Sequence, residues 1–207
     1  MTLPTLLFAA VVGFNHAFEA DHVLAVGNIA NRRNTFLEAI RDGLFWGLGH
    51  TSTILLVGCI IIVGKLTLNI GSFEYLEVVV GVTLVALGIF RIGKLRKANQ
   101  KIAKPTPADS KLAYSIGLIH GLAGSGAVVL IAMSEIESSS LSIVYILLFG
   151  AGSILGMIIV AMLFKIPIGS RSGVSIKIQN SFIMLSGILC IGYGLFMIYS
   201  FSGLCKK

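Results

Sequence analysis

Six continuous apolar runs, each long enough to cross a bilayer, divide the chain. A membrane-crossing helix needs about 20 such residues, whereas an outer-membrane strand needs about ten of alternating polarity. Because the runs are long and do not alternate, they predict helices. With 56% hydrophobic and only 12% charged residues, the 207-residue chain leaves no room for a soluble domain. The predicted fold is an all-α integral membrane protein, one transporter domain over residues 1–207, with six transmembrane helices near residues 3–29, 43–64, 75–92, 112–133, 142–164 and 181–201.

Basic residues gather in every second connection between these runs. Thirteen Lys and Arg follow runs one, three and five, whereas the other side has three, which are Lys65, Lys206 and Lys207. The positive-inside rule then predicts a multi-pass protein of the cytoplasmic (inner) membrane with both termini outside the cytoplasm. Residues 95–111 are predicted to be a basic cytoplasmic linker. The net charge of +7 therefore indicates orientation and lipid contact, not nucleic-acid binding.

The two halves of the chain resemble each other at a nearly constant offset. Residues 13–18 align with 117–122, residues 44–50 with 147–153, and the glycines at 81 and 88 with those at 187 and 194. Each half holds three spans, an odd number, so the second half must enter from the opposite side. We predict two inverted three-helix repeats, residues 1–94 and 112–207, with a substrate site between them. The alternative is chance similarity between glycine-rich membrane helices.

Four ionisable residues interrupt the first run, and such groups are expensive inside a membrane. On a continuous helix His16, Glu19 and His22 share a face, and Asp21 points about 140° away from His16. His16 and His22 would lie about 9 Å apart along the axis, too far for both to bind one ion at about 2.1 Å. Either the helix is unwound here, or only some of the four residues bind the ion.

All four histidines of the chain, which include His50 and His120, lie in predicted spans. One such residue alone would be interpreted as an interhelical hydrogen bond. Together they favour a divalent transition metal, because imidazole suits Ni, Co, Cu and Zn, whereas Mg and Ca prefer oxygen. We expect the cation to lose water to His16, His22 and His50, with His120 completing the site from the second repeat and acidic side chains offsetting the charge.

The segment 16–22, His-Ala-Phe-Glu-Ala-Asp-His, resembles the His-x-x-x-x-Asp-His signature of the nickel/cobalt transporter family (NiCoT). Residues 48–53, Leu-Gly-His-Thr-Ser-Thr, resemble that family's second motif, Leu-Gly-His-Ser-Thr. The resemblance implies metal contact by His16, Asp21, His22 and His50. Candidates for supporting roles, or for contributions from the second repeat, are Asn15, Glu19, Thr51, Ser52, His120, Ser125 and Ser153.

The resemblance also has departures. Family members typically have eight spans with the signature in the second, whereas here it falls in the first. Asn15 replaces an Arg, Glu19 replaces a common Asp, and residues 119–126 replace an acidic motif of the later half. This last stretch is similar to the short, urease-accessory, nickel-permease-like relatives of NiCoT.

The predicted function is uptake of Ni²⁺ or Co²⁺ into the cytoplasm, with the metal as substrate, no cofactor and no catalytic residues. The expected partners are the metal ion, the lipid bilayer, and either further copies of the chain or metal-enzyme maturation proteins. Two alternatives stay open. The first is a proton-coupled exporter of metal or of a small organic solute, and the second is an intramembrane metalloenzyme.

Overall fold

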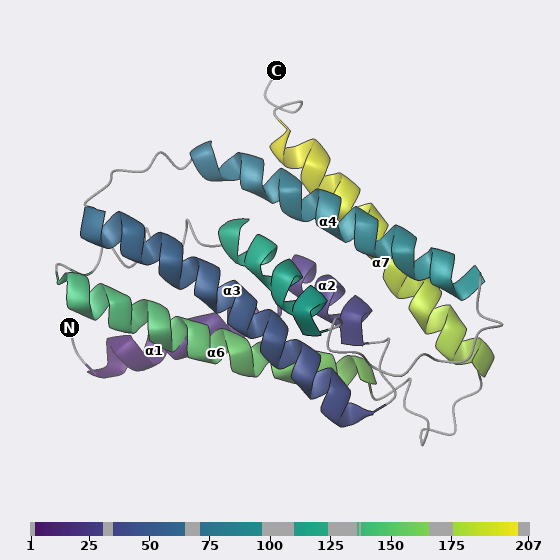
Figure 1. The fold of residues 1–207 in the computed structure, drawn as a ribbon, viewed down its shortest axis with the longest axis horizontal. Helices are drawn as coiled ribbons and strands as arrows, with labels where there is room; N and C mark the ends of the chain where they lie inside the picture. Colours follow the sequence, from purple (N-terminus) through teal and green to yellow (C-terminus); the bar gives the residue numbers. More distant parts are fainter. Residues whose placement is uncertain are drawn as a thin grey trace.

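Helices make up nearly all of the structure, a computed structural model that describes residues 3–30, 35–64, 71–96, 110–123, 136, 138–165 and 176–202. The first predicted span is two helices, α1 (Leu3–His16) and α2 (Ala20–Ala30). They are followed by α3 (Phe36–Gly64), α4 (Gly71–Arg96), a helix over 110–123, α6 (Ser139–Lys165) and α7 (Ile176–Phe201) (Figure 1). The described part of the predicted span 112–133 is therefore helical, and residues 124–133 lie outside the described residues.

The helices pack as long, nearly aligned pairs. Helix α4 packs along α7, and α6 packs against both α3 and α1 (Figure 1). The short α2 contacts α3, α4, α6 and α7, so it lies at the centre of the bundle. Within the described residues, four segments are long and apolar enough to cross a membrane, namely Phe36–Ile62, Tyr75–Leu95, Ser139–Lys165 and Lys177–Phe201. Leu6–His16 is a shorter apolar helix. The helical membrane class predicted from the sequence agrees with this architecture.

Of the two alternatives for the first span, the structure has the interrupted helix. The regular helix ends at His16 and resumes at Ala20, with a turn between them. In this turn the amide of Phe18 donates to the carbonyl of Asn15 at 2.9 Å, and the amide of Glu19 donates to that of His16 at 3.1 Å. These are three-residue spacings, tighter than the four-residue spacing of an α-helix. The angular relations expected for a continuous helix over 16–22 are therefore wrong.

Helix α3 begins seven residues before the predicted apolar run because a capping box precedes that run. The Thr35 hydroxyl accepts from the Glu38 amide, and the Glu38 carboxylate accepts from the Thr35 amide, both at 3.3 Å. This reciprocal pair satisfies two amides that the first helical turn leaves unpaired. The polar first turns of α3 are thus helical without belonging to the apolar span.

Glycines allow the paired helices to touch through their backbones. A Cβ on Gly81 of α4 would lie 2.8 Å from the carbonyl oxygen of Gly194, and one on Gly194 would lie 2.5 Å from that of Gly81. Gly88 and Gly187 face each other in the same way. Lipid tails are as apolar as the side chains, so no hydrophobic force draws helices together inside a membrane. Close contacts between small residues drive their association there instead.

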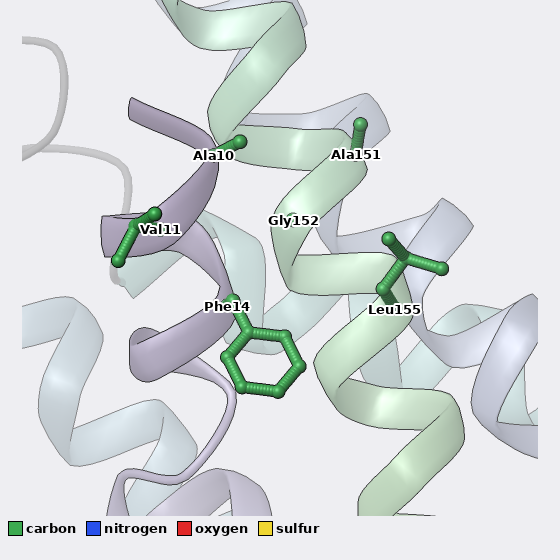
Figure 2. A pocket seen from close by; sticks show the side chains of 6 residues that line it. All are labelled: Ala10, Val11, Phe14, Ala151, Gly152 and Leu155. Carbon is green, nitrogen blue, oxygen red and sulfur yellow. The ribbon is translucent and has the colours of Figure 1, made fainter. Parts of the chain in front are cut away.

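Large apolar side chains cover the outside of this bundle, as expected for a surface that faces lipid. A shallow apolar groove runs along the α1–α6 contact, lined by Ala10, Val11, Phe14, Ala151, Gly152 and Leu155 (Figure 2). None of the four histidines lines it. We therefore assign the groove to the lipid-facing surface.

We predict opposite effects for alanine at two glycines of α7. Gly194→Ala should destabilise the protein by about 1–3 kcal/mol, because the new methyl group would overlap the backbone of α4. A methyl group on Gly192 would meet nothing within 4 Å. Gly192→Ala should therefore be neutral or stabilising by up to about 1 kcal/mol through lower backbone entropy. Thermal unfolding in detergent measures both, and equal effects would contradict this packing.

Candidate metal site

The turn between α1 and α2 folds the chain so that two histidines meet. His16 is the last residue of α1, and His22 lies in the first turn of α2. Their ring centroids are 4.4 Å apart, about half of the separation along a continuous helix axis. The interruption thus removes the geometric obstacle to a shared ion.

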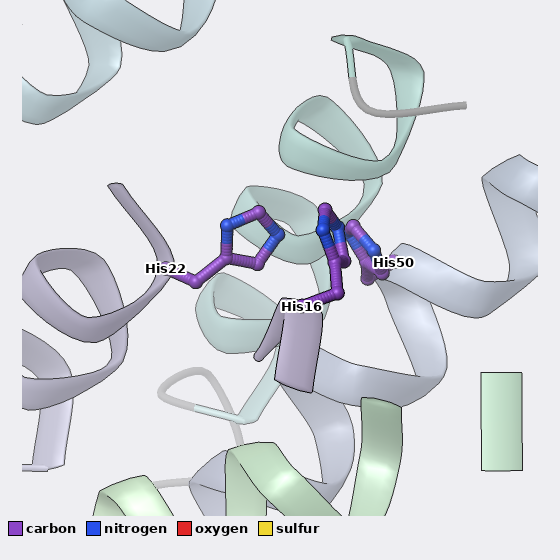
Figure 3. A group of neighbouring side chains, drawn as sticks. All are labelled: His16, His22 and His50. Atoms are coloured by element: carbon purple, nitrogen blue, oxygen red, sulfur yellow. The ribbon is translucent and has the colours of Figure 1, made fainter. Parts of the chain in front are cut away.

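His50, near the middle of α3, completes a group of three imidazoles. Its ring centroid lies 5.3 Å from that of His16 and 5.0 Å from that of His22. One ring nitrogen from each of the three lies within 4.8 Å of the others (Figure 3). Figure 3 shows that these side chains come from separate helical segments and point toward one another.

His120 approaches the same place from the helix over 110–123. Its ring centroid is 5.8 Å from that of His22, and its side chain is only 1% exposed. A Cβ on the next residue, Gly121, would overlap the backbone oxygen of His50. Because Gly121 has no side chain, this helix can lie directly against α3 and bring His120 into the group.

Three of the four imidazoles have an acceptor next to Nδ1. Nδ1 of His16 lies 2.8 Å from a carboxylate oxygen of Glu19, and Nδ1 of His22 lies 2.9 Å from one of Asp21. Nδ1 of His120 lies 3.1 Å from the carbonyl oxygen of Ile116. Carboxylates and carbonyls only accept hydrogen bonds, so the hydrogen bonds of His16 and His120 favour the proton on Nδ1 of these two rings. In neutral rings of this tautomer, Nε2 carries a lone pair. The contact between His22 and Asp21 has the distance of an ion pair but not the geometry of a hydrogen bond.

The Nε2 atoms of His16, His22 and His120 are buried and have no hydrogen-bond partner among the described residues. The same holds for Nδ1 of His22 and for both ring nitrogens of His50. A buried polar atom without a partner costs about 1–3 kcal/mol. Such atoms are rare in folded proteins, and four histidines carry them here in one place. The arrangement can bind a cation that accepts nitrogen ligands.

Trp46, which belongs to neither sequence motif and was not among the predicted site residues, packs against three of the imidazoles. Its ring stacks on His50 with centroids 5.6 Å apart and planes 7° apart. The centroids of His22 and His120 each lie 5.2 Å from it. Trp46 precedes His50 by one helical turn, and this spacing is the sequence feature that could have identified it. Tryptophan is not itself a metal ligand, however. It restricts the rotamers of the rings that it touches.

The hydroxyl groups proposed for supporting roles bind backbone carbonyls. Thr51 donates to Gly150 at 3.3 Å, Ser52 to Leu48 at 2.7 Å, and Ser153 to Gly13 at 3.0 Å. These bonds connect or stabilise the helices that carry the histidines. Asn15 is exposed, and Ser125 lies outside the described residues.

Comparison with known proteins finds two that are similar to this chain. The chain is 37% identical over 210 residues to the urease accessory protein UreH of Bacillus sp. (strain TB-90), covering 96% of this chain and 92% of that protein. It is 32% identical over 96 residues to a high-affinity nickel transport protein of Cupriavidus necator, covering 45% of this chain and 27% of that protein. No protein-family model matches the chain, and no solved structure matches it.

The likeness to UreH extends over almost the whole of both proteins, so it is not confined to the histidine motifs. The matched proteins are a transport protein and an accessory protein. Together with the long apolar helices, this likeness makes the chain a multi-pass membrane protein. The chain belongs to the nickel/cobalt transporter family (NiCoT), in the short branch that contains the urease accessory protein UreH.

Proposed function

We propose that this protein carries a divalent transition-metal cation, Ni²⁺ or Co²⁺, across the cytoplasmic membrane into the cytoplasm, and that the histidine group is its binding site. The observation that supports this most strongly is the convergence of buried, unpartnered Nε2 atoms. The names of the relatives, a urease accessory protein and a nickel transport protein, point to nickel. Imidazole is a good ligand for both nickel and cobalt.

The spacing of the nitrogens is close to what one ion requires. Two ligands that each bind at about 2.1 Å lie at most about 4.2 Å apart. The ring nitrogens of His16, His22 and His50 lie within 4.8 Å of one another. Small rotations of the side chains would therefore close the site around a cation, with His120 next to it as a fourth ligand.

The two carboxylates act on the imidazoles and on the charge of the ion. A histidine that binds a metal usually donates its other N–H to a carboxylate or carbonyl, which fixes the ring and increases its basicity. Glu19 and Asp21 are placed to do this for His16 and His22. Two ionised carboxylates also balance one divalent cation, so the loaded site is neutral and less costly to hold away from water.

The six-span inverted repeat stays our proposal for the architecture, and the helix contacts support it. The repeat makes Gly81 equivalent to Gly187, and Gly88 equivalent to Gly194. A two-fold axis would then pair Gly81 with Gly194 and Gly88 with Gly187, and these are the pairs in contact.

A second pair of contacts has the same symmetry. A Cβ on Gly13 would overlap the carbonyl oxygen of Phe149, and one on the equivalent Gly117 would overlap that of Trp46. Phe149 and Trp46 are themselves equivalent in the repeat alignment. The proposed axis therefore passes between the halves near the histidine group, where inverted-repeat transporters bind their substrate.

The membrane potential is sufficient to drive uptake. At about 2.3 kcal/mol per charge per 100 mV, a divalent cation that moves inward across 100 mV gains about 4.6 kcal/mol. This corresponds to a concentration ratio of about 10³. The proposed transport therefore needs no ATPase partner.

We predict that His22→Ala and His50→Ala each abolish saturable Ni²⁺ binding and uptake, because each removes one of three converging ligands. The chain has a single tryptophan, Trp46, next to these rings, so quenching of its fluorescence by Ni²⁺ measures binding directly. Radiolabelled Ni²⁺ in liposomes under an imposed potential measures transport. His120→Ala should weaken binding less.

The control variant is Thr83→Ala on α4. The exposed Thr83 hydroxyl donates to the carbonyl of Val79 in its own helix at 2.9 Å, so this variant should bind and carry Ni²⁺ normally. Normal uptake by both His22→Ala and His50→Ala would overturn the proposed site.

We predict an intermediate effect for Asp21→Asn. It keeps the size of the side chain but removes the charge next to His22 Nδ1, so Ni²⁺ affinity should fall about 10–100-fold without being lost. Titration of Trp46 fluorescence gives the affinity. A loss as complete as that of His22→Ala would make Asp21 a direct ligand instead, and wild-type affinity would exclude both roles.

We predict that both ends of the chain lie outside the cytoplasm. Alkaline phosphatase fused at the C-terminus should be active, and green fluorescent protein at the same place should be dark. Fusions that end within residues 97–109 should give the reverse pattern. A fluorescent C-terminal fusion would contradict six spans in this orientation.

A further inference from the structure

A second group of possible ligand atoms shares His22 with the imidazole group. One carboxylate oxygen each from Glu19 and Asp21 lies within 4.8 Å of a ring nitrogen of His22. Exposure decreases along this group, from 57% for the Glu19 side chain to 15% for Asp21 and 2% for His22. The three side chains therefore lead from the surface of the protein to the buried site.

A third carboxylate, Glu77, lies on α4, which packs against α2. It interacts electrostatically with Asp21, Glu19 and His22, although it is not among the atoms that lie within 4.8 Å of one another. Tyr193 of α7 interacts electrostatically with the same carboxylates. Glu77 is half-buried and lies within the candidate span Tyr75–Leu95, where an ionised group is costly unless it has a function or a partner.

Three carboxylates in one neighbourhood repel one another, and a cation between them removes the repulsion. The group also includes the buried side chain of His22, which has two ring nitrogens that can bind a cation. Nδ1 of His22 lies 2.9 Å from a carboxylate oxygen of Asp21, and neither ring nitrogen of His22 has a hydrogen-bond partner among the described residues. Figure 3 shows one ring nitrogen of His22 turned toward His16 and the other turned away, so His22 has one nitrogen on each side of the boundary between the two groups.

We propose that Glu19, Asp21 and Glu77 form an outer capture site for a hydrated divalent cation, which then passes to the imidazole group by way of His22. This inference rests on the proposed function. Oxygen ligands suit a cation that still keeps part of its water, and the imidazoles replace that water in the second step. Glu77 belongs to neither histidine motif, and its role is to raise the local concentration of cation at the entrance.

The test is the rate of Ni²⁺ association, measured by stopped-flow quenching of Trp46 fluorescence in the purified full-length protein. Negative charge at an entrance accelerates the association of a cation, and salt screens this effect. Glu77→Gln should slow association about tenfold at low ionic strength and leave the dissociation rate nearly unchanged. Glu77→Asp, which keeps the charge, should associate at nearly the wild-type rate.

Two further readouts are independent of folding defects in Glu77→Gln. First, the rate of Ni²⁺ association with the wild-type protein should fall steeply with added salt. Second, the Ni²⁺ concentration that gives half-maximal uptake should rise in parallel, while the maximal uptake rate stays the same. An association rate that is insensitive to both salt and Glu77→Gln would overturn the capture site while leaving the imidazole site intact. If the wild-type protein neither bound nor carried Ni²⁺, the proposed function would fail, and this inference would fail with it.

Discussion

The candidate site depends on the interruption of the first predicted span between His16 and Ala20. A regular helix would place His16 and His22 about 9 Å apart along its axis, whereas the turn brings their rings to 4.4 Å. Non-helical backbone inside a membrane is tolerated only where protein or a polar cavity surrounds it. Contacts of α2 with four other helices provide that protein environment.

The candidate site combines buried imidazole rings with ring nitrogens that have no hydrogen-bond partner in the described part of the chain. The rings of His22, His50 and His120 are almost completely buried, yet each has a nitrogen without a partner among the described residues. A carboxylate or a backbone carbonyl lies next to Nδ1 of three of the rings. One ring nitrogen each of His16, His22 and His50 lies within 4.8 Å of the others. Unpaired buried nitrogens lower the free energy of unfolding, and a cation bound to them would raise it again.

Close helix packing fixes these side chains in position. Gly121 lets the helix over 110–123 lie against α3 at His50, and this contact sets the depth of His120. Trp46 then fills the space between the rings of His50 and His120. The hydroxyls of Thr51 and Ser153, which we expect in supporting roles, connect α3 to α6 and α6 to α1.

The sequence by itself determined the helical membrane class, the approximate positions of the four long apolar helices and the histidines that gather, because long apolar runs and buried ionisable groups each have few physical solutions. It left open whether the first span is continuous, because hydropathy does not distinguish a helix from a helix with a three-residue turn. Only the tertiary structure decided that each ring has a nitrogen without a hydrogen-bond partner among the described residues, that Trp46 contacts three of the rings, and that Glu77 of another helix interacts electrostatically with Asp21. These features depend on contacts between residues distant in the chain, which no local pattern encodes.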